Sequence, residues 1–265
     1  MNELDGVSLA ALRRQVGGIE DEAELLRWSQ RLGRDARLGA RRLAAQCQRR
    51  ADKRTAEKQR LRGLLERRDG LALRGLTHVA GVDEVGVGPL AGPVVAAAVI
   101  LPEQVDLLGL DDSKRVRPAA RRRLAAGVRA VCLGCGIGVV EPAEIDELNI
   151  YHAALEAMRR AVVELAETCT PDYLLVDARR VPGVATPQTA IVHGDANDAT
   201  IAAASIVAKV YRDDLMVRLD KRYSGYGFAQ HMGYGTVQHL AALRALGPSP
   251  VHRRSFAPVA EVART

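Results

Sequence analysis

Two adjacent acids, Asp83 and Glu84, close a short apolar run, and a glycine-rich turn follows them at once. Two further acids stand after later apolar runs, Asp177 in "LLVDARR" and Asp195 in "IVHGDAND". A buried carboxylate is costly unless a metal ion, a shared proton or an arginine compensates its charge. Where several carboxylates gather at neighbouring strand ends, hard divalent ions such as Mg²⁺ are the partners that suit them best. The four acids therefore indicate a candidate metal site.

Phosphoryl transfer is the chemistry that such a site would suit. Two ions about 3.5 to 4 Å apart, bridged by one carboxylate, can activate a water and stabilise the leaving oxygen of a phosphodiester. A single acid at a strand end is weaker evidence, because it often caps a helix or pairs with an arginine such as Arg179 beside Asp177. Asp198 follows Asp195 by one helical turn and is placed within reach of the same region.

The adjacent pair Asp83 and Glu84 sets a geometric constraint. Neighbouring residues of a regular strand face opposite sides of a sheet, so both acids can reach one site only if the strand ends between them. The following segment, "GVGPLAGP", predicts such an ending, and its glycines leave main-chain N–H groups open to a phosphate or a sugar. The turn is not a P-loop, because no Gly-Lys-Ser or Gly-Lys-Thr follows it.

The elements that must position these acids are short strands and longer helices. Apolar runs rich in Val and Ile predict strands at residues 79–82, 94–101, 132–140 and 173–178. A further run covers residues 189–195, and helical patterns cover residues 142–167 and 199–223. This order indicates an α/β fold, with a mixed sheet covered by helices.

The basic charge of the chain is concentrated near its start. Residues 1–74 carry 18 Lys and Arg against 11 Asp and Glu, which leaves 20 and 21 for the remainder. Leucines recur between Asp21 and Arg68 at a loosely helical spacing, which predicts two or three helices with Trp28 in a small apolar seam. We therefore divide the chain into a basic helical extension, residues 1–74, and an α/β domain, residues 75–265. The extension is either a solvated helical arm or a surface for a polyanion such as nucleic acid.

The sequence does not resemble that of a membrane-spanning protein or of a secreted, disulfide-rich protein. The apolar run "VVAAAVIL" is too short to cross a bilayer, and the first residues do not resemble a secretory signal, so we expect a cytoplasmic protein without membrane contact. Four cysteines do not make a disulfide framework. Cys132 and Cys135 have C-x-x-C spacing, but no second pair or histidine follows, and we interpret them as structural.

Seven segments, in order, resemble bacterial ribonuclease HII across about residues 77–259. They are "AGVDEVGVGPLAGPVVAAAVIL", "GLDDSKR", "EIDELNIYHAALEAMRRAV", "LLVDARRVP", "GDANDATIAAASIVAKVYRD", "YSGYGFAQHMGYGT" and "GPSPVHRRSFAPV". Most of residues 1–74 lie outside the resemblance, although some bacterial members carry a comparable helical extension.

The resemblance implies an RNase H-like fold with a C-terminal helical segment. It also implies the activity of an endonuclease that depends on divalent metal ions. Such enzymes cut the RNA strand of RNA·DNA hybrids and incise 5′ of single ribonucleotides in duplex DNA, leaving a 3′-hydroxyl and a 5′-phosphate. Its catalytic metal ligands would be Asp83, Glu84, Asp177 and Asp195, with Mg²⁺ or Mn²⁺ as cofactor and Asp83 bridging the ions. We expect the protein to act as a monomer on these nucleic acids.

The resemblance also implies residues that contact substrate. Gly86, Val87 and Gly88 stand where the family has Gly-Arg-Gly or Gly-Lys-Gly, whose main chain meets the 2′-hydroxyl at the RNA–DNA junction. Tyr234 matches the tyrosine that stacks on the junction sugar. Ser113 and Lys114, in the matching Asp-Ser-Lys segment, suit phosphate oxygens.

The departures from the family leave two rival functions open. Val87 removes a cationic side chain, and Asn197 and Asp198 replace a less acidic segment, which we expect to make the rim of the site more acidic. One rival is a hybrid-binding protein without turnover, and the other is a DNA-only nuclease of the same fold. His193, His231 and His252 are interpreted as loop or packing residues, because a metal-bound water needs no histidine base.

Overall fold

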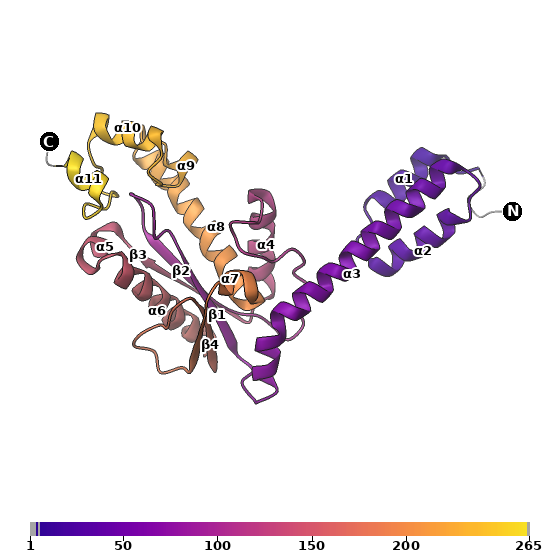
Figure 1. Cartoon of the computed structure of the whole chain (residues 1–265), viewed down its shortest axis with the longest axis horizontal. Coiled ribbons are helices and arrows are strands. Elements are labelled where there is room, and N and C mark those ends of the chain that lie inside the picture. Colours follow the sequence, from indigo (N-terminus) through magenta and orange to yellow (C-terminus); the bar gives the residue numbers. More distant parts are fainter. Residues whose placement is uncertain (1–3, 5, 264–265) are drawn as a thin grey trace. The chain divides into compact units, whose positions relative to one another are not determined.

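The computed structural model describes Leu4 and residues 6–263 (Figure 1). The chain forms two compact units, Met1–Gly63 and Leu64–Thr265, and the division falls within a long helix. Within the described residues, no helix is both long and apolar enough to span a bilayer.

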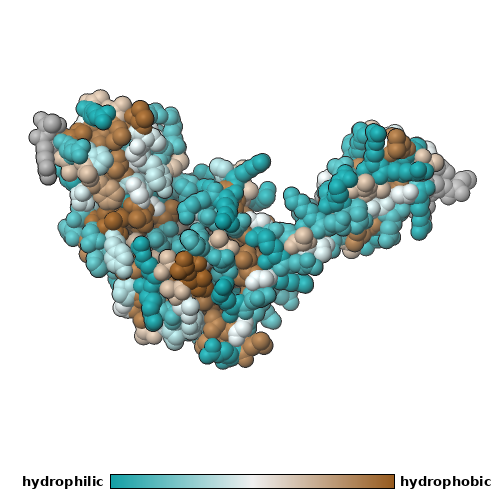
Figure 2. Space-filling view, in the orientation of Figure 1, coloured by the Kyte–Doolittle hydropathy of each residue, from teal (hydrophilic) through white to brown (hydrophobic). Residues whose placement is uncertain are grey.

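Unit Met1–Gly63 is built from helices. They are α1 (Leu9–Gly17), α2 (Glu22–Gly33) and the larger part of α3 (Leu38–Ala72). Leu12, Leu25 and Leu32 are fully buried in its core, and Trp28 packs against that core while partly exposed. The predicted helices and apolar seam are therefore confirmed, and the visible face of this unit is mostly hydrophilic (Figure 2). Leu38 differs from the expected pattern, since it begins α3 with 63% of its surface exposed.

Unit Leu64–Thr265 contains a five-stranded mixed sheet, as predicted. Its strands are β1 (Val79–Val85), β2 (Val94–Ile100), β3 (Gly134–Val140), β4 (Tyr173–Asp177) and β5 (Gln188–Ile191). The spatial order is β3-β2-β1-β4-β5, in which β1, β2 and β3 pair antiparallel and β1, β4 and β5 pair parallel. Strand β1 is therefore central, and its carboxyl end lies beside that of β4.

Helices cover both faces of this sheet (Figure 1). They are α4 (Pro118–Val131), α5 (Pro142–Leu148), α6 (Ile150–Thr168), α7 (Gly194–Asn197), α8 (Ala199–Arg222), α9 (Phe228–His231), α10 (Val237–Leu246) and α11 (Ala257–Val262). Helix α6 packs on β2 and β3, and α8 packs on β1 and β2. Strand β2 is buried at every position, which explains why its sequence is continuously apolar rather than alternating.

Two features of the helices differ from the prediction. Helix α4 was not expected, because its arginine-rich sequence has only a short apolar stripe, Leu124, Ala125 and Val128. The single helix predicted for residues 142–167 is wrong, since it breaks at Asn149. Asn149 has a φ of 66°, and its side chain accepts hydrogen bonds from the first N–H groups of α6. Asparagine tolerates the left-handed region and is a favoured N-cap, so one residue both ends α5 and begins α6.

Alternating glycines in β3 allow α6 to lie directly on the sheet. A Cβ at Gly136 would overlap the carbonyl oxygen of Ala161, and one at Gly138 would overlap that of Ala157. Any side chain at either position would push the helix away from the strand.

We expect Gly138→Ala to destabilise the protein by about 1 to 3 kcal/mol, because overpacking at a backbone contact must shift α6. Gly70→Ala is the control, since a Cβ there meets nothing within 4 Å. Alanine at that helical position should be neutral or stabilising. Urea unfolding of both variants measures the effect, and equal stabilities would contradict this account of the packing.

Candidate metal centre and substrate-facing turn

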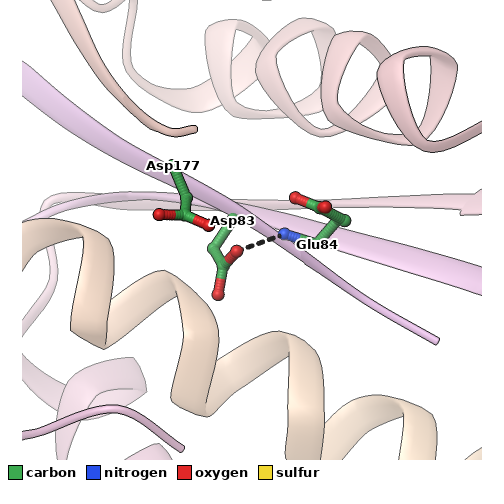
Figure 3. A group of neighbouring side chains, drawn as sticks. All are labelled: Asp83, Glu84 and Asp177. Atoms are coloured by element: carbon green, nitrogen blue, oxygen red, sulfur yellow. Dashed lines mark hydrogen bonds between the residues drawn. The ribbon is translucent and has the colours of Figure 1, made fainter. Parts of the chain in front are cut away.

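The parallel pairing of β1 with β4 brings three acids together. The ladder ends at Val82 and Val176, so Asp83 and Asp177 are the next residues on their strands. One carboxylate oxygen from each of Asp83, Glu84 and Asp177 lies within 4.8 Å of the others (Figure 3). Among the residues that the structure describes, no other group of three or more His, Cys, Asp or Glu meets the same criterion.

The expectation that the strand ends between Asp83 and Glu84 is wrong. Strand β1 continues to Val85 and pairs both acids with β2, Asp83 with Ala97 and Glu84 with Ala96. The hydrogen bonds to β4 have already stopped at Val82, so this edge of β1 is open at the two acids. Side chains from opposite faces of the strand can therefore approach Asp177 around that open edge.

Local hydrogen bonds hold two of these carboxylates in place. An Asp83 oxygen accepts from the main-chain N–H of Glu84 at 2.8 Å (Figure 3), and Asp177 Oδ1 accepts from the N–H of Gly194 at 2.7 Å. Glu84 Oε2, in contrast, is buried and has no hydrogen-bond partner.

The electrostatics of the cluster fit a divalent cation. Burial, followed by the charge of Glu84, holds the pKa of Asp83 well above its usual value. Burial, followed by the charge of Asp177, raises the pKa of Glu84. Arg179 and Lys114 offset the raised pKa of Glu84 only in part, so the cluster keeps excess negative charge. Carboxylate oxygens are the ligands that Mg²⁺ and Mn²⁺ prefer. The unpartnered Glu84 oxygen is a further sign that a cation completes the site.

Asp195 lies near the cluster but outside the group of three. It is 8% exposed on the one-turn helix α7, and its carboxylate lies 3.6 Å from the ammonium group of Lys114. Burial, followed by the charges of Asp112 and Asp177, raises the pKa of Asp195. The Lys114 side chain is 81% exposed, so this ion pair contributes little stability and can open.

Asp198 does not belong to the rim of the site, which corrects the expectation from sequence. It is fully buried, and its Oδ1 accepts from the N–H groups of Thr200 and Ile201 as the N-cap of α8. Asn197 is exposed, and its carbonyl oxygen accepts a hydrogen bond from Arg67 at 2.7 Å. Asp198 therefore adds no acidic group to the rim of the site, contrary to the expectation from sequence.

Two buried arginines fix the turn that follows the acids. Arg253 donates to the carbonyl oxygens of Gly86, Val87 and Gly92. Arg212 donates to the carbonyl oxygens of residues 91, 93 and 232. In the described part of the chain, the hydrogen bonds of both guanidinium groups go to main-chain oxygens. Sequence reasoning missed both residues, because no local pattern reveals a contact more than 100 positions away.

The predicted substrate residues Val87, Gly88 and Tyr234 lie together. Val87 packs against the apolar core with its side chain, and Gly88 is exposed. A Cβ at Gly88 would lie 3.7 Å from Cε1 of Tyr234, whose side chain is 45% exposed. The turn and an exposed aromatic ring are therefore neighbours, and their contact with substrate stays a prediction.

Ser113 and Lys114 occupy the loop before α4. The Ser113 hydroxyl is buried and lies 3.0 Å from that of Ser205, so it faces the protein, whereas Lys114 faces solvent beside Asp195. Substrate contact by Ser113 stays a prediction. The four cysteines are free thiols, and burial raises the pKa of Cys135 to about 11, which agrees with the structural interpretation.

A mixed sheet of this order, with acids at the adjoining ends of β1 and β4, defines the RNase H-like class of nucleases. A family model described as Ribonuclease HII matches residues 80–259. The chain belongs to the ribonuclease HII family and is accordingly an endonuclease that hydrolyses RNA in RNA–DNA hybrids.

Curated bacterial relatives extend the match beyond the catalytic region. The Ribonuclease HII of Geobacillus thermodenitrificans is 52% identical over 235 residues, which cover 89% of each chain. That of Geobacillus kaustophilus is 49% identical over 254 residues, covering 96% of this chain and 94% of the relative. The second match includes most of residues 1–74, so this relative carries a segment that aligns with the extension.

Solved structures share the fold of the catalytic unit. The ribonuclease H2 of Pyrococcus horikoshii is 26% identical, with a TM-score of 0.59, over 70% of this chain and 97% of that one. The structure of a PCNA:RNase HII complex from Archaeoglobus fulgidus gives 27% identity and a TM-score of 0.58, over 68% and 95% of the two chains.

Metal-free protein should gain stability when one acid of the cluster is neutralised. The pKa of Asp83 is higher in the folded chain than the value of about 3.9 for an unfolded Asp, so its ionisation weakens the fold as pH rises above that value. At pH 7 we expect Asp83→Asn to raise the Tm of the metal-free protein by several degrees, at about 2 to 4 °C per kcal/mol.

The difference in Tm between Asp83→Asn and wild type should vanish near pH 3, where the Asp83 carboxyl is protonated in both the folded and the unfolded chain. Asp106→Asn, at an exposed acid, is the control and should leave the Tm unchanged. Calorimetry in a chelating buffer measures both variants, and a lower Tm for Asp83→Asn at pH 7 would contradict the proposed repulsion.

Proposed function

We propose that the chain incises duplex DNA on the 5′ side of single embedded ribonucleotides, in addition to cutting RNA·DNA hybrids, and leaves a 3′-hydroxyl and a 5′-phosphate. The observation that carries this proposal is the cluster of Asp83, Glu84 and Asp177 with an unpartnered buried oxygen. The cluster lies on the strand that leads directly into the Gly86–Gly88 turn.

The proposed mechanism uses two divalent ions. Asp83, Glu84, Asp177 and Asp195 would hold them, and the ions would supply a nucleophilic water and stabilise the leaving oxygen. The raised pKa values of Asp83, Glu84 and Asp195 fit groups that must share cations. Lys114 lies beside Asp195 and its side chain is exposed. Its ammonium group is suited to a phosphate of the nucleic-acid backbone.

The proposed reading of the ribonucleotide uses the main chain of the turn. Arg253 fixes the carbonyl groups of Gly86 and Val87, so the turn keeps its shape although Val87 carries no charge. Tyr234 would stack on the sugar beside Gly88. Selection of RNA would then rest on contacts with the 2′-hydroxyl rather than with bases.

Cleavage assays on matched duplexes test the proposal. The substrates are a DNA duplex with one ribonucleotide, the same duplex in all-DNA form, and an RNA·DNA hybrid, each with Mg²⁺ and separately with Mn²⁺. We expect cutting of the first and third and none of the second. Cutting of all-DNA would support a DNA-only nuclease, and binding without cutting in either metal would support a hybrid-binding protein.

Acid variants test which residues carry the reaction. Asp83→Asn and Asp195→Asn should each reduce the rate by about 10³-fold or more, because a lost metal ligand removes several kcal/mol of transition-state stabilisation. Asp198→Asn is the matched control, since asparagine preserves the N-cap of α8, and its rate should stay within a few-fold of wild type. Equal losses in all three variants would remove the support for the assigned ligands.

The basic extension is proposed to add nucleic-acid contacts. The end of α3 belongs to the catalytic unit, where Arg68 is buried and donates to the carbonyl oxygens of Pro102 and Glu103. A deletion that tests the extension should therefore remove residues 1–63 and keep these contacts.

We expect this deletion to weaken duplex binding and to flatten the dependence of log Kd on log salt, because fewer counterions are released. The rate at saturating substrate should be retained. Fluorescence anisotropy over a salt series measures the slope. An unchanged slope would assign the extension to another partner.

A further inference from the structure

A buried hydrogen-bond chain runs from the C-terminal region to Tyr234. Ser249 N and Oγ lie 3.0 and 2.8 Å from His252 Nδ1, and His252 Nε2 lies 3.1 Å from His239 Nε2. His239 Nδ1 in turn lies 2.9 Å from the carbonyl oxygen of Tyr234. Both histidines are almost completely buried, at 0% and 2% exposure.

The chemistry of the partners fixes the direction of every bond. A carbonyl oxygen only accepts, so His239 Nδ1 must carry the proton that it donates to Tyr234. Neutral His239 then accepts at Nε2, and His252 must donate from its own Nε2. His252 Nδ1 is left as the acceptor for the N–H of Ser249. Burial lowers the pKa of both histidines, that of His252 to about 4, so both are neutral at pH 7 as the chain requires.

We infer that His239, supported by His252, is a positioning residue that holds the main chain of Tyr234 so that its ring lies beside Gly88. This inference rests on the proposed function, because it takes Tyr234 to be the residue that contacts the substrate sugar. It adds an anchor to those of Arg212, which holds Met232 in the same loop, and Arg253, which holds Gly86 in the turn.

The loop around Tyr234 depends on such anchors. Met232 and Gly233 both have positive φ, and Leu90 N–H donates to the Gly233 carbonyl oxygen at 2.8 Å. The Tyr234 carbonyl oxygen accepts from Thr236 N–H at 2.8 Å and from His239. Tyr234 is 45% exposed, so few neighbours hold its ring in place. The position of the ring therefore depends on the main chain of residue 234.

A matched pair of variants isolates the bond to Tyr234. Asparagine at position 239 places an amide nitrogen where Nδ1 stands, so His239→Asn keeps the donor, whereas His239→Leu removes it. Both variants lose the bond with His252 and share that cost. Phe228→Leu is the control for the aromatic packing, because Phe228 is buried and contacts His239 edge-on at 5.5 Å without donating to Tyr234.

The test is a double-mutant cycle on cleavage of the single-ribonucleotide duplex. We expect His239→Leu to lower kcat/KM by about tenfold and His239→Asn by less than about threefold, typical of coupled contacts. In a Tyr234→Ala background, His239→Leu should change kcat/KM by less than about twofold, because the residue it positions is gone. Phe228→Leu should lower kcat/KM by less than about threefold, as His239→Asn does.

Amide hydrogen exchange of residues 231–236, without substrate, makes the outcome independent of turnover. Faster exchange in His239→Leu than in His239→Asn is expected. Equal exchange in the two variants, or a His239→Leu loss that is undiminished in Tyr234→Ala, would overturn the inference. The expected exchange difference in a protein that cuts none of the three duplexes would instead overturn the proposed function and leave the positioning intact.

Discussion

Repulsion among clustered carboxylates is the constraint on which the rest of the catalytic unit depends. Asp83, Glu84 and Asp177 present oxygens within 4.8 Å of each other, at an edge where β1 and β4 have stopped pairing. Such a cluster is unfavourable by itself and becomes favourable with a divalent cation. The cluster therefore lowers the stability of the metal-free protein and provides a place where cations can bind. Such a loss of stability is common at functional sites.

The turn that follows the acids and the Tyr234 loop show the opposite arrangement of charge. Arg212 and Arg253 are fully buried, and their hydrogen bonds go to carbonyl oxygens of the segments around Gly86 and Met232. A guanidinium group offers five donors in a fixed geometry, so one arginine can hold several main-chain oxygens at once. The turn and the Tyr234 loop are thus rigid supports beside a charge-dependent metal centre. Rigid support of this kind would suit the reading of one hydroxyl group that we propose for the turn.

The sequence predicted much of the fold, and the acids that the structure groups together, for identifiable reasons. Buried strands appear as apolar runs, and acids at their ends are visible without any knowledge of topology. The convergence of Asp83 and Glu84 was predicted for the wrong reason, because it depends on where the β1–β4 ladder stops and not on an end of β1 between them. The role of Asp198 as an N-cap, the break at Asn149 and helix α4 were also missed or misread, since each depends on local geometry that propensity resolves poorly. Arg253 reaches oxygens up to 167 residues away, which no local pattern encodes.

The central claim is that a divalent cation relieves the repulsion in the acidic cluster, and Mn²⁺ binding measures this most directly. Metal-free wild type and Asp83→Asn would each be titrated with Mn²⁺, free Mn²⁺ would be followed by electron paramagnetic resonance, and Mg²⁺ would then be added as competitor. We predict saturable uptake by wild type that Mg²⁺ displaces, and loss of that uptake in Asp83→Asn. Equal uptake by the two proteins would contradict the account, because the cluster would then not be the site that holds the metal.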